Sequence, residues 1–331
     1  MQANVNADIL TGGLQADVFV TSLLGMVYVD AVAEKSNKKW AVVQLSFPTT
    51  PTREFPFAGL DYFNFPAYNL FTYWLLRAVF WNLNKKHLNE FRRLLDLPPL
   101  KRSIYRKVDA AKVPNLYGVS RTLLPRPRDW GSEIDVTGFI VLSQDKRETH
   151  KMDHIPQGLT AWLQAGEPPV YIGFGSMPVP DPGAFAIMLN QLLTRTGHRF
   201  IFCQGWSALP DLTENPRLYI LKYINHEWLL PQCKAAIIHG GVGTLAAVLR
   251  ARIPLIVLSI FGDQVWWGKL IDKRKIGVHI PFKKVNTDKL SAAILLALSP
   301  ERSGNVREIG IRIGSEDGLK QIVQTLEAYF E

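Results

Sequence analysis

The sequence has little cysteine, no excess of acidic residues and no long apolar run. Only Cys203 and Cys233 occur among 331 residues, and they form no CxxC motif. Two cysteines in a chain of this length fit a reducing cytosol better than a disulfide-stabilised secreted fold. The first ten residues, MQANVNADIL, lack the basic and apolar regions of a signal peptide. We therefore expect a cytoplasmic protein.

Other classes of site and partner are also missing. No stretch reaches the about 18 to 20 apolar residues of a membrane-spanning helix. The nearest, Leu70 to Leu83, is interrupted by Arg77. No DxD motif or His/Cys cluster offers a set of metal ligands. No DNA- or RNA-binding module is recognisable, so we expect no metal cofactor and no nucleic-acid partner.

The composition favours a globular α/β protein with an anionic partner. Hydrophobic residues make up 47% of the chain, which is enough for full cores, and its length fits about two domains. Apolar strand-like runs at residues 18–22 and 40–47 are separated by a helix-like stretch, which indicates parallel α/β architecture. The net charge of +9 is compatible with a nucleotide diphosphate or an acidic membrane surface.

A Gly-rich turn after a short apolar strand is the most informative feature. His239 ends the strand, and Gly240, Gly241 and Gly243 precede a helix-like stretch. Glycines let the backbone approach a ligand, and the N–H groups and dipole of a first helical turn favour phosphate. We expect Thr244 to cap this helix and His239 to donate to a phosphate oxygen as a leaving group gains charge. A satisfied buried histidine is the alternative interpretation of His239.

A second polar group follows the next apolar strand. Asp263 and Gln264 come directly after Gly262. In a parallel sheet they lie at the carboxyl end of a strand, where ligands bind. A carboxylate next to an amide is suited to hydrogen bonding of vicinal sugar hydroxyls. One βαβ unit thus offers a diphosphate site and a sugar site at the same edge.

These motifs resemble the donor-binding signature of the sterol glucosyltransferases, which belong to the inverting UDP-sugar glycosyltransferases. The similarity runs without a gap from His239 to Gln264, and it extends to YIGFGSMP at residues 171–178. It is looser at residues 47–56 and 123–130. The resemblance implies the GT-B fold, in which two Rossmann-like domains face a cleft, and a UDP-sugar as co-substrate without any other cofactor.

Several residue assignments rest on that resemblance. Gly175 and Ser176 are expected near the donor diphosphate, with a plain tight turn as the alternative. Trp228 is the candidate for stacking on uracil, with a core position as the alternative. Arg252 stands where the family leads us to expect glycine, and Ser259 where proline is usual. If residue 252 is left-handed, arginine costs about 1 kcal/mol relative to glycine.

The resemblance also divides the chain. We expect a partial acceptor-side domain, a linker, a UDP-sugar donor domain and a helix that returns to the first domain, at residues 1–142, 143–158, 159–313 and 314–331. The family's N-terminal Gly-rich loop and the catalytic base of that region have no counterpart here, so the N-terminal domain is interpreted as incomplete. The catalytic residue stays unassigned, because nothing distinguishes the carboxylates of Asp30, Glu54 and Asp61.

Residues 54–93 are rich in aromatic side chains, and basic residues follow closely. One interpretation is ordinary core packing. The other is a lipophilic acceptor pocket or a surface that touches anionic lipid at the membrane.

The sequence predicts metal-independent, inverting transfer of a sugar, first of all glucose from UDP-glucose, to a sterol or another lipophilic hydroxyl. One alternative is a non-catalytic UDP-sugar-binding protein, or a subunit of a split glycosyltransferase whose partner chain supplies the N-terminal segment. A UDP-sugar epimerase of similar fold and a membrane-surface module with a vestigial donor site are two others.

Overall fold

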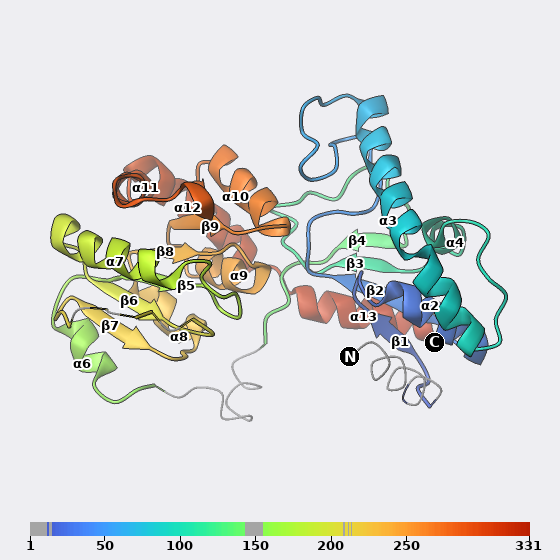
Figure 1. Cartoon of the computed structure of the whole chain (residues 1–331), viewed down its shortest axis with the longest axis horizontal. Helices are drawn as coiled ribbons and strands as arrows, with labels where there is room; N and C mark the ends of the chain where they lie inside the picture. The colour runs from blue at the N-terminus through green and yellow to red at the C-terminus, as the bar shows by residue number, and fades with distance from the viewer. Residues whose placement is uncertain (1–11, 13–14, 143–154, 208, 211, 213) are drawn as a thin grey trace. The chain divides into compact units, whose positions relative to one another are not determined.

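The computed structural model describes residues 12, 15–142, 155–207, 209–210, 212 and 214–331 (Figure 1). The chain forms two compact units, the first from Met1–Ile140 with Asp317–Glu331 and the second from Val141–Glu316. The first ten residues, used above to argue against a signal peptide, lie outside the described residues. So does most of the expected linker, at residues 143–154.

The first unit is built on a parallel sheet in the order β1-β2-β3-β4. Its strands are β1 (Phe19–Thr21), β2 (Trp40–Gln44), β3 (Asn115–Tyr117) and β4 (Ile134–Val136). Its helices are α2 (Met26–Ser36), α3 (Pro66–Leu94), α4 (Ile104–Ala110) and α13 (Gly318–Phe330). The C-terminal α13 is tied to β2, because Lys39 Nζ donates to the carbonyl of Tyr329 at 2.7 Å.

A buried ion network joins three helices of this unit. Arg92 of α3 is 1% exposed, and it donates to both carboxylate oxygens of Glu34 on α2, each at 2.9 Å. Lys107 of α4 donates to Asp30 at 2.7 Å and to Glu34 at 2.6 Å. The hydrogen bond from Arg92 lowers the pKa of Glu34 to about 2. Asp30, one of the carboxylates considered as a base, is therefore part of a structural network.

The second unit is built on a larger parallel sheet in the order β10-β9-β8-β5-β6-β7. Its strands are β5 (Val170–Gly173), β6 (Phe200–Cys203), β7 (Leu218–Leu221), β8 (Ala235–Ile238), β9 (Leu255–Ser259) and β10 (Gly277–Pro281). The chain runs outward from β5 to β7 and then returns to the other side of β5 as β8. This reversal between β5 and β8 is a topological switch point, where open α/β sheets bind ligands.

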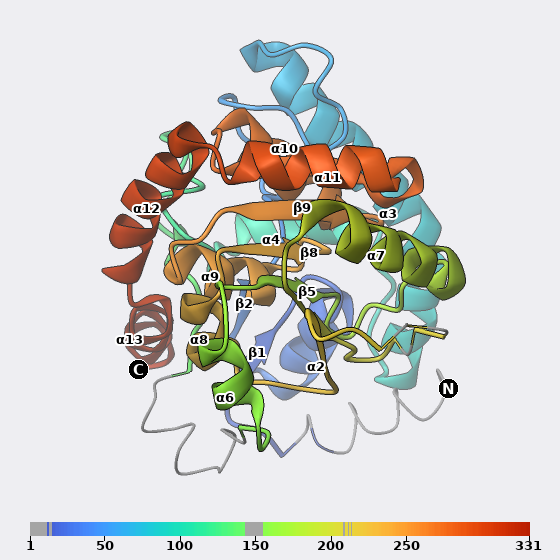
Figure 2. The same ribbon diagram turned by 90° about the vertical axis from the view of Figure 1, so that its left-hand side faces the viewer.

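Helices cover the sheet and fill the loops between its strands. They are α6 (Leu159–Gln164), α7 (Pro182–Thr196), α8 (His226–Leu229), α9 (Val242–Arg250), α10 (Asp263–Lys273), α11 (Thr287–Ala297) and α12 (Pro300–Gly314), with 3₁₀ turns η1 (Leu230–Gln232) and η2 (Phe282–Lys284). Apolar residues of α7 and α11 form one core with alternate residues of β5, β8 and β9. Figure 2 shows these two helices on the same side of the strands. Buried residues of α9 are absent from that core, and α9 packs against α8 and α12.

The predicted fold class is confirmed, because both sheets are parallel and alternate with helices. Gly197 ends α7 with a left-handed φ of 66°, a conformation that glycine adopts without strain. In the described part of the chain, no helix combines the length and hydrophobicity that crossing a bilayer requires.

Arg252 lies in the left-handed region with φ of 60°, two residues after the end of α9. Residue 252 is therefore left-handed, which is the condition under which arginine was expected to cost stability relative to glycine. A side chain at such a position is strained, because its Cβ crowds the backbone, whereas glycine is not.

This strain predicts that glycine at residue 252 is more stable than alanine. Both substitutions remove the arginine side chain, so their difference isolates the backbone effect. We expect Arg252→Gly to exceed Arg252→Ala in free energy of unfolding by about 1 kcal/mol, measured by urea denaturation. At Arg307, inside helix α12, the order should reverse by about 1 kcal/mol. The same order at both positions would contradict the assignment.

Candidate functional site

Three loops at the carboxyl edge of the second sheet carry most of the predicted site residues. Strands β5, β8 and β9 are neighbours in the sheet, so the loops that follow them emerge side by side. The loop after β5 carries Gly175 and Ser176. The loop after β8 carries His239 to Gly241 and leads into Thr244 in the first turn of α9, and the loop after β9 leads into Asp263 and Gln264 at the start of α10. The structure therefore brings these residues together at the switch point of the second sheet.

The turn between β8 and α9 requires glycine at two positions. Gly240 has φ of 94°, and a Cβ on it would lie 2.8 Å from Val257 Cγ1. A Cβ on Gly241 would lie 2.3 Å from His239 Nε2. Nothing lies within 4 Å of the position that a Cβ on Gly243 would take. The backbone is therefore packed tightly against the sheet on one side and open at Gly243.

Thr244 does not cap helix α9, so that prediction was wrong. The helix begins at Val242 with Gly241 as its N-cap, and no side chain caps it. Thr244 lies in the first turn instead, because the N-cap is Gly241, three residues before the expected one. The N–H groups of this first turn are not bonded by a capping side chain, and that arrangement suits an anion.

His239 lies between the two Gly-containing loops. It is 9% exposed, and its Cε1 is 3.6 Å from the place that a Cβ on Gly175 would take. Burial lowers the pKa of His239, so the ring is neutral at neutral pH and carries one N–H. Its Nδ1 is buried and has no hydrogen-bond partner among the described residues. The alternative of a fully satisfied buried histidine does not fit this orphaned atom.

Asp263 and Gln264 begin α10, but they are placed differently. Gln264 is 4% exposed, and its Oε1 accepts hydrogen bonds from the backbone N–H of Ile260 at 2.8 Å and of Phe261 at 3.3 Å. It thereby fixes the turn that leads from β9 into the helix. Asp263 is half-buried, and burial raises its pKa. The two side chains are adjacent in sequence, but the carbonyl of Gln264 is already used within the turn.

Sequence comparison identifies relatives of this chain. Residues 199–318 match the family model described as the C-terminal domain of erythromycin biosynthesis protein CIII-like proteins. A sterol 3-beta-glucosyltransferase of Arabidopsis thaliana is 35% identical over 286 residues, which cover 85% of this chain and 44% of the relative. One from Cryptococcus neoformans is 31% identical over 303 residues, which cover 85% of this chain and 19% of the relative.

The chain is similar in sequence to sterol 3-beta-glucosyltransferases. It spans less than half the length of these curated relatives.

Solved structures of other proteins share the fold of this chain. The glycosyltransferase of kitacinnamycin superposes with a TM-score of 0.68 at 16% identity, covering 99% of this chain and 82% of that one. A UDP-glucose: anthocyanidin 3-O-glucosyltransferase in complex with UDP superposes with a TM-score of 0.60 at 13% identity, covering 98% and 74%. The expected GT-B fold is thus confirmed.

Two exposed aromatic residues of this chain, Trp206 and Tyr223, were not singled out from the sequence. Trp206 follows β6 and is 75% exposed, and Tyr223 follows β7 and is 70% exposed. The backbone N–H of Trp206 donates to the carbonyl of Gly175 at 3.2 Å, so the backbone at this residue lies against the loop after β5. Trp228, the residue chosen from the sequence, is half-buried on α8, which packs against α9. An aromatic directly after Gly205 at a strand end was the available signal for Trp206.

The side chain of His226 has a hydrogen-bond partner within the second unit of this chain. Its Nε2 lies 2.7 Å from the hydroxyl of Tyr171, a buried residue of β5. This bond ties α8 to the middle of the sheet. Burial lowers the pKa of His226 to about 4, from an ordinary value of 6.5.

The shifted pKa predicts acid sensitivity. Below pH 6.5 the unfolded chain binds a proton at His226 that the folded chain binds only near pH 4, so stability falls as the pH drops through this range. The slope is up to about 1.4 kcal/mol per pH unit. His226→Gln removes the titrating group and should flatten the curve of unfolding free energy against pH. The exposed His87, changed to Gln, serves as the control and should leave the slope unchanged; equal slopes in all three proteins would refute the prediction.

Proposed function

We propose that the second unit binds a UDP-sugar, first of all UDP-glucose, for transfer to a sterol or another lipophilic alcohol. The observation that carries this proposal is the uncapped N-terminus of α9, reached through Gly240 and Gly241 at the switch point, with His239 beside it. The names of the relatives, which are sterol 3-beta-glucosyltransferases, support the choice of substrate class.

In this proposal the diphosphate lies over the first turn of α9. The N–H groups of Gly243 and Thr244 and the hydroxyl of Thr244 are available to its oxygens, and His239 donates its single N–H. Gly175 and Ser176 approach the diphosphate from the neighbouring loop. A neutral donor and a helix N-terminus stabilise the negative charge that develops on a leaving diphosphate, so this site works without a metal ion.

In our proposal the sugar and the nucleobase lie on opposite sides of that diphosphate. Asp263, together with the amide nitrogen of Gln264, binds sugar hydroxyls next to the loop after β9. The nucleobase stacks toward the loops after β6 and β7, where Trp206 and Tyr223 offer exposed rings and Trp228 is close in sequence. Aromatic faces bind bases through their π surfaces.

The catalytic base that would deprotonate the acceptor hydroxyl is a separate question. One observation favours the alternative of a donor-binding subunit. Asp30 is held by Lys107 in the ion network, and Glu54 Oε1 accepts a hydrogen bond from the Arg128 N–H at 2.7 Å. Asp30 and Glu54 thus take part in structural interactions. Incubation with labelled UDP-glucose and a sterol distinguishes the alternatives: label in the organic phase supports catalysis, and donor binding without transfer supports a subunit.

Donor binding provides the direct test of the site. Asp263→Asn removes the charge that binds sugar hydroxyls, so we expect the affinity for UDP-glucose to fall about tenfold while the affinity for UDP changes less than about twofold. His239→Ala should weaken both ligands, since the diphosphate is common to them. Isothermal titration calorimetry measures the affinity of each of the two variants for UDP and for UDP-glucose. Asp288→Asn, at an exposed residue of α11, is the matched control. Equal losses of UDP and UDP-glucose in Asp263→Asn would remove the sugar assignment.

We also propose that α3 touches an anionic membrane surface. Phe71 and Trp74 are 50% and 60% exposed, and their rings stack with centroids 6.3 Å apart. Phe71, Leu75, Lys86 and Arg93 are exposed and spaced by four, eleven and seven residues, so they share one face of the helix. An aromatic end that is followed by basic side chains is typical of interfacial helices. This proposal makes the chain a peripheral membrane protein of the cytoplasmic side.

Vesicle sedimentation tests this surface. Binding to vesicles with phosphatidylserine should exceed binding to neutral phosphatidylcholine vesicles and decrease with salt, because the basic residues contribute. The double variant Phe71→Ser with Trp74→Ser should bind about tenfold less, since two large apolar side chains no longer leave water. Leu295 and Ile311, exposed apolar residues of the second unit at 65% and 56%, are changed to Ser as the control. A loss of the same size in the control pair would disprove the assignment to α3.

A further inference from the structure

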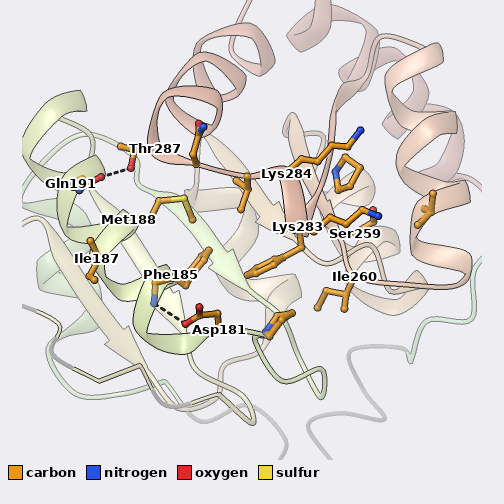
Figure 3. A pocket seen from close by; sticks show the side chains of 17 residues that line it. Asp181, Phe185, Ile187, Met188, Gln191, Ser259, Ile260, Lys283, Lys284 and Thr287 are labelled. Atoms are coloured by element: carbon orange, nitrogen blue, oxygen red, sulfur yellow. Dashed lines mark hydrogen bonds between the residues drawn. The ribbon is translucent and has the colours of Figure 1, made fainter.

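A cavity of about 940 Å³ lies in the second unit, outside the set of residues proposed for the donor (Figure 3). Its walls come from α7, from the end of β9, from the start of α10 and from the segment that joins β10 to α11. Its size is within the range of small-molecule sites. The sequence pattern gave no sign of this cavity, because its walls come from four separate segments.

The interior of this cavity is mainly apolar. Phe185 and Met188 of α7 belong to the buried core, and they lie on the α7 side in Figure 3. Phe282 opens the turn η2, and its ring stacks on Phe185 with centroids 5.9 Å apart. Ile260 and Val285 add apolar surface, and the polar side chains of the lining include Gln191, which accepts a hydrogen bond from Thr287, and Ser259, which bonds His279. An apolar chain or ring system could therefore leave water here without leaving polar groups unpaired.

The mouth of the cavity is cationic. Lys283 and Lys284 follow Phe282 directly, are exposed, and lie across the cavity from α7 in Figure 3. Neither ammonium group is close enough to a carboxylate for an ion pair among the described residues. Of the nearby acids, Asp181 accepts the N–H of Ala184 at 2.9 Å as the cap of α7, and Asp288 pairs with Arg195 at 2.7 Å. The anchored ring of Phe282 holds the two lysines at this rim.

We infer that this cavity is a binding site for an amphiphile with one apolar chain and an anionic head group. The chain occupies the space between Phe185, Met188 and Ile260, and the carboxylate or phosphate of the head group lies at Lys283 and Lys284. Apolar walls alone would accept a neutral lipid equally well. The two lysines without ion-pair partners at the rim favour the anionic one.

The cavity also adjoins the turn of the proposed sugar site. Ile260 lines the cavity, and its backbone N–H is held by Gln264 Oε1 at 2.8 Å. A ligand in the cavity therefore packs against the segment that positions Asp263. The inference itself does not depend on the proposed function, because the amphiphile is bound without any nucleotide.

The test is titration of the chain with oleate, lysophosphatidic acid and neutral monoolein, each below its critical micelle concentration, in calorimetry without UDP-sugar. We expect oleate, lysophosphatidic acid or both to bind with one site, at least about tenfold more tightly than monoolein. The two anionic arms distinguish a fatty-acid carboxylate from a lysophospholipid phosphate. Equal affinity for monoolein would overturn the role of the lysines, and no binding of any of the three would overturn the site.

Two variants locate the binding. Ala184→Trp places a large ring in the cavity from an exposed position of α7, and it should abolish binding. Lys283→Glu with Lys284→Glu should reduce oleate affinity at least about tenfold while leaving monoolein unchanged. Lys269→Glu with Lys273→Glu, a charge change of the same size on α10, is the matched control. A cooperative urea-unfolding transition in each variant shows that it is folded. Undiminished oleate binding in Ala184→Trp would place the ligand elsewhere and disprove the inference.

Discussion

Close approach of backbone at the carboxyl ends of β5, β8 and β9 is the constraint on which the second unit depends. At Gly240 the chain turns with a left-handed φ and passes within contact distance of Val257 on the next strand. At Gly241 there is room only for hydrogen beside the ring of His239. Because these two residues have no side chains, α9 starts immediately after the strand and its first N–H groups are presented at the edge of the sheet. Larger residues would displace both the helix and the histidine.

The sequence predicted this part of the molecule well, for a physical reason. Strand, glycines and helix start follow each other within ten residues, so their geometry is determined locally. The parallel sheet and the turn at Gly240 and Gly241 were recognisable, and the left-handed conformation of Arg252 was considered as a condition that the structure meets. The error at Thr244 is of the same local kind, because a threonine near a helix start is a common N-cap. Here the two preceding glycines allowed an earlier start.

Features that depend on contacts between distant segments could not be predicted. Trp206 and Tyr223 are exposed because they follow the ends of β6 and β7, and the family resemblance led to Trp228 instead. The bond of His226 with Tyr171 joins residues 55 positions apart. Gln264 looked like a ligand residue, yet its carbonyl stabilises its own turn. In the first unit, the carboxylates of Asp30 and Glu34 are paired with residues of α3 and α4, which no local motif reveals.

The last helix has a consequence for how the chain can be divided. Helix α13 comes after every element of the second unit in sequence, but it belongs to the first unit, where Lys39 holds the carbonyl of Tyr329. A fragment cut at any single peptide bond therefore leaves one unit incomplete. Exchange of the second unit between related proteins must keep the final fifteen residues with the first unit, as an insertion of the second unit into the first. In an exchange at the level of the gene, the second unit is therefore replaced as an internal segment and not as a C-terminal one.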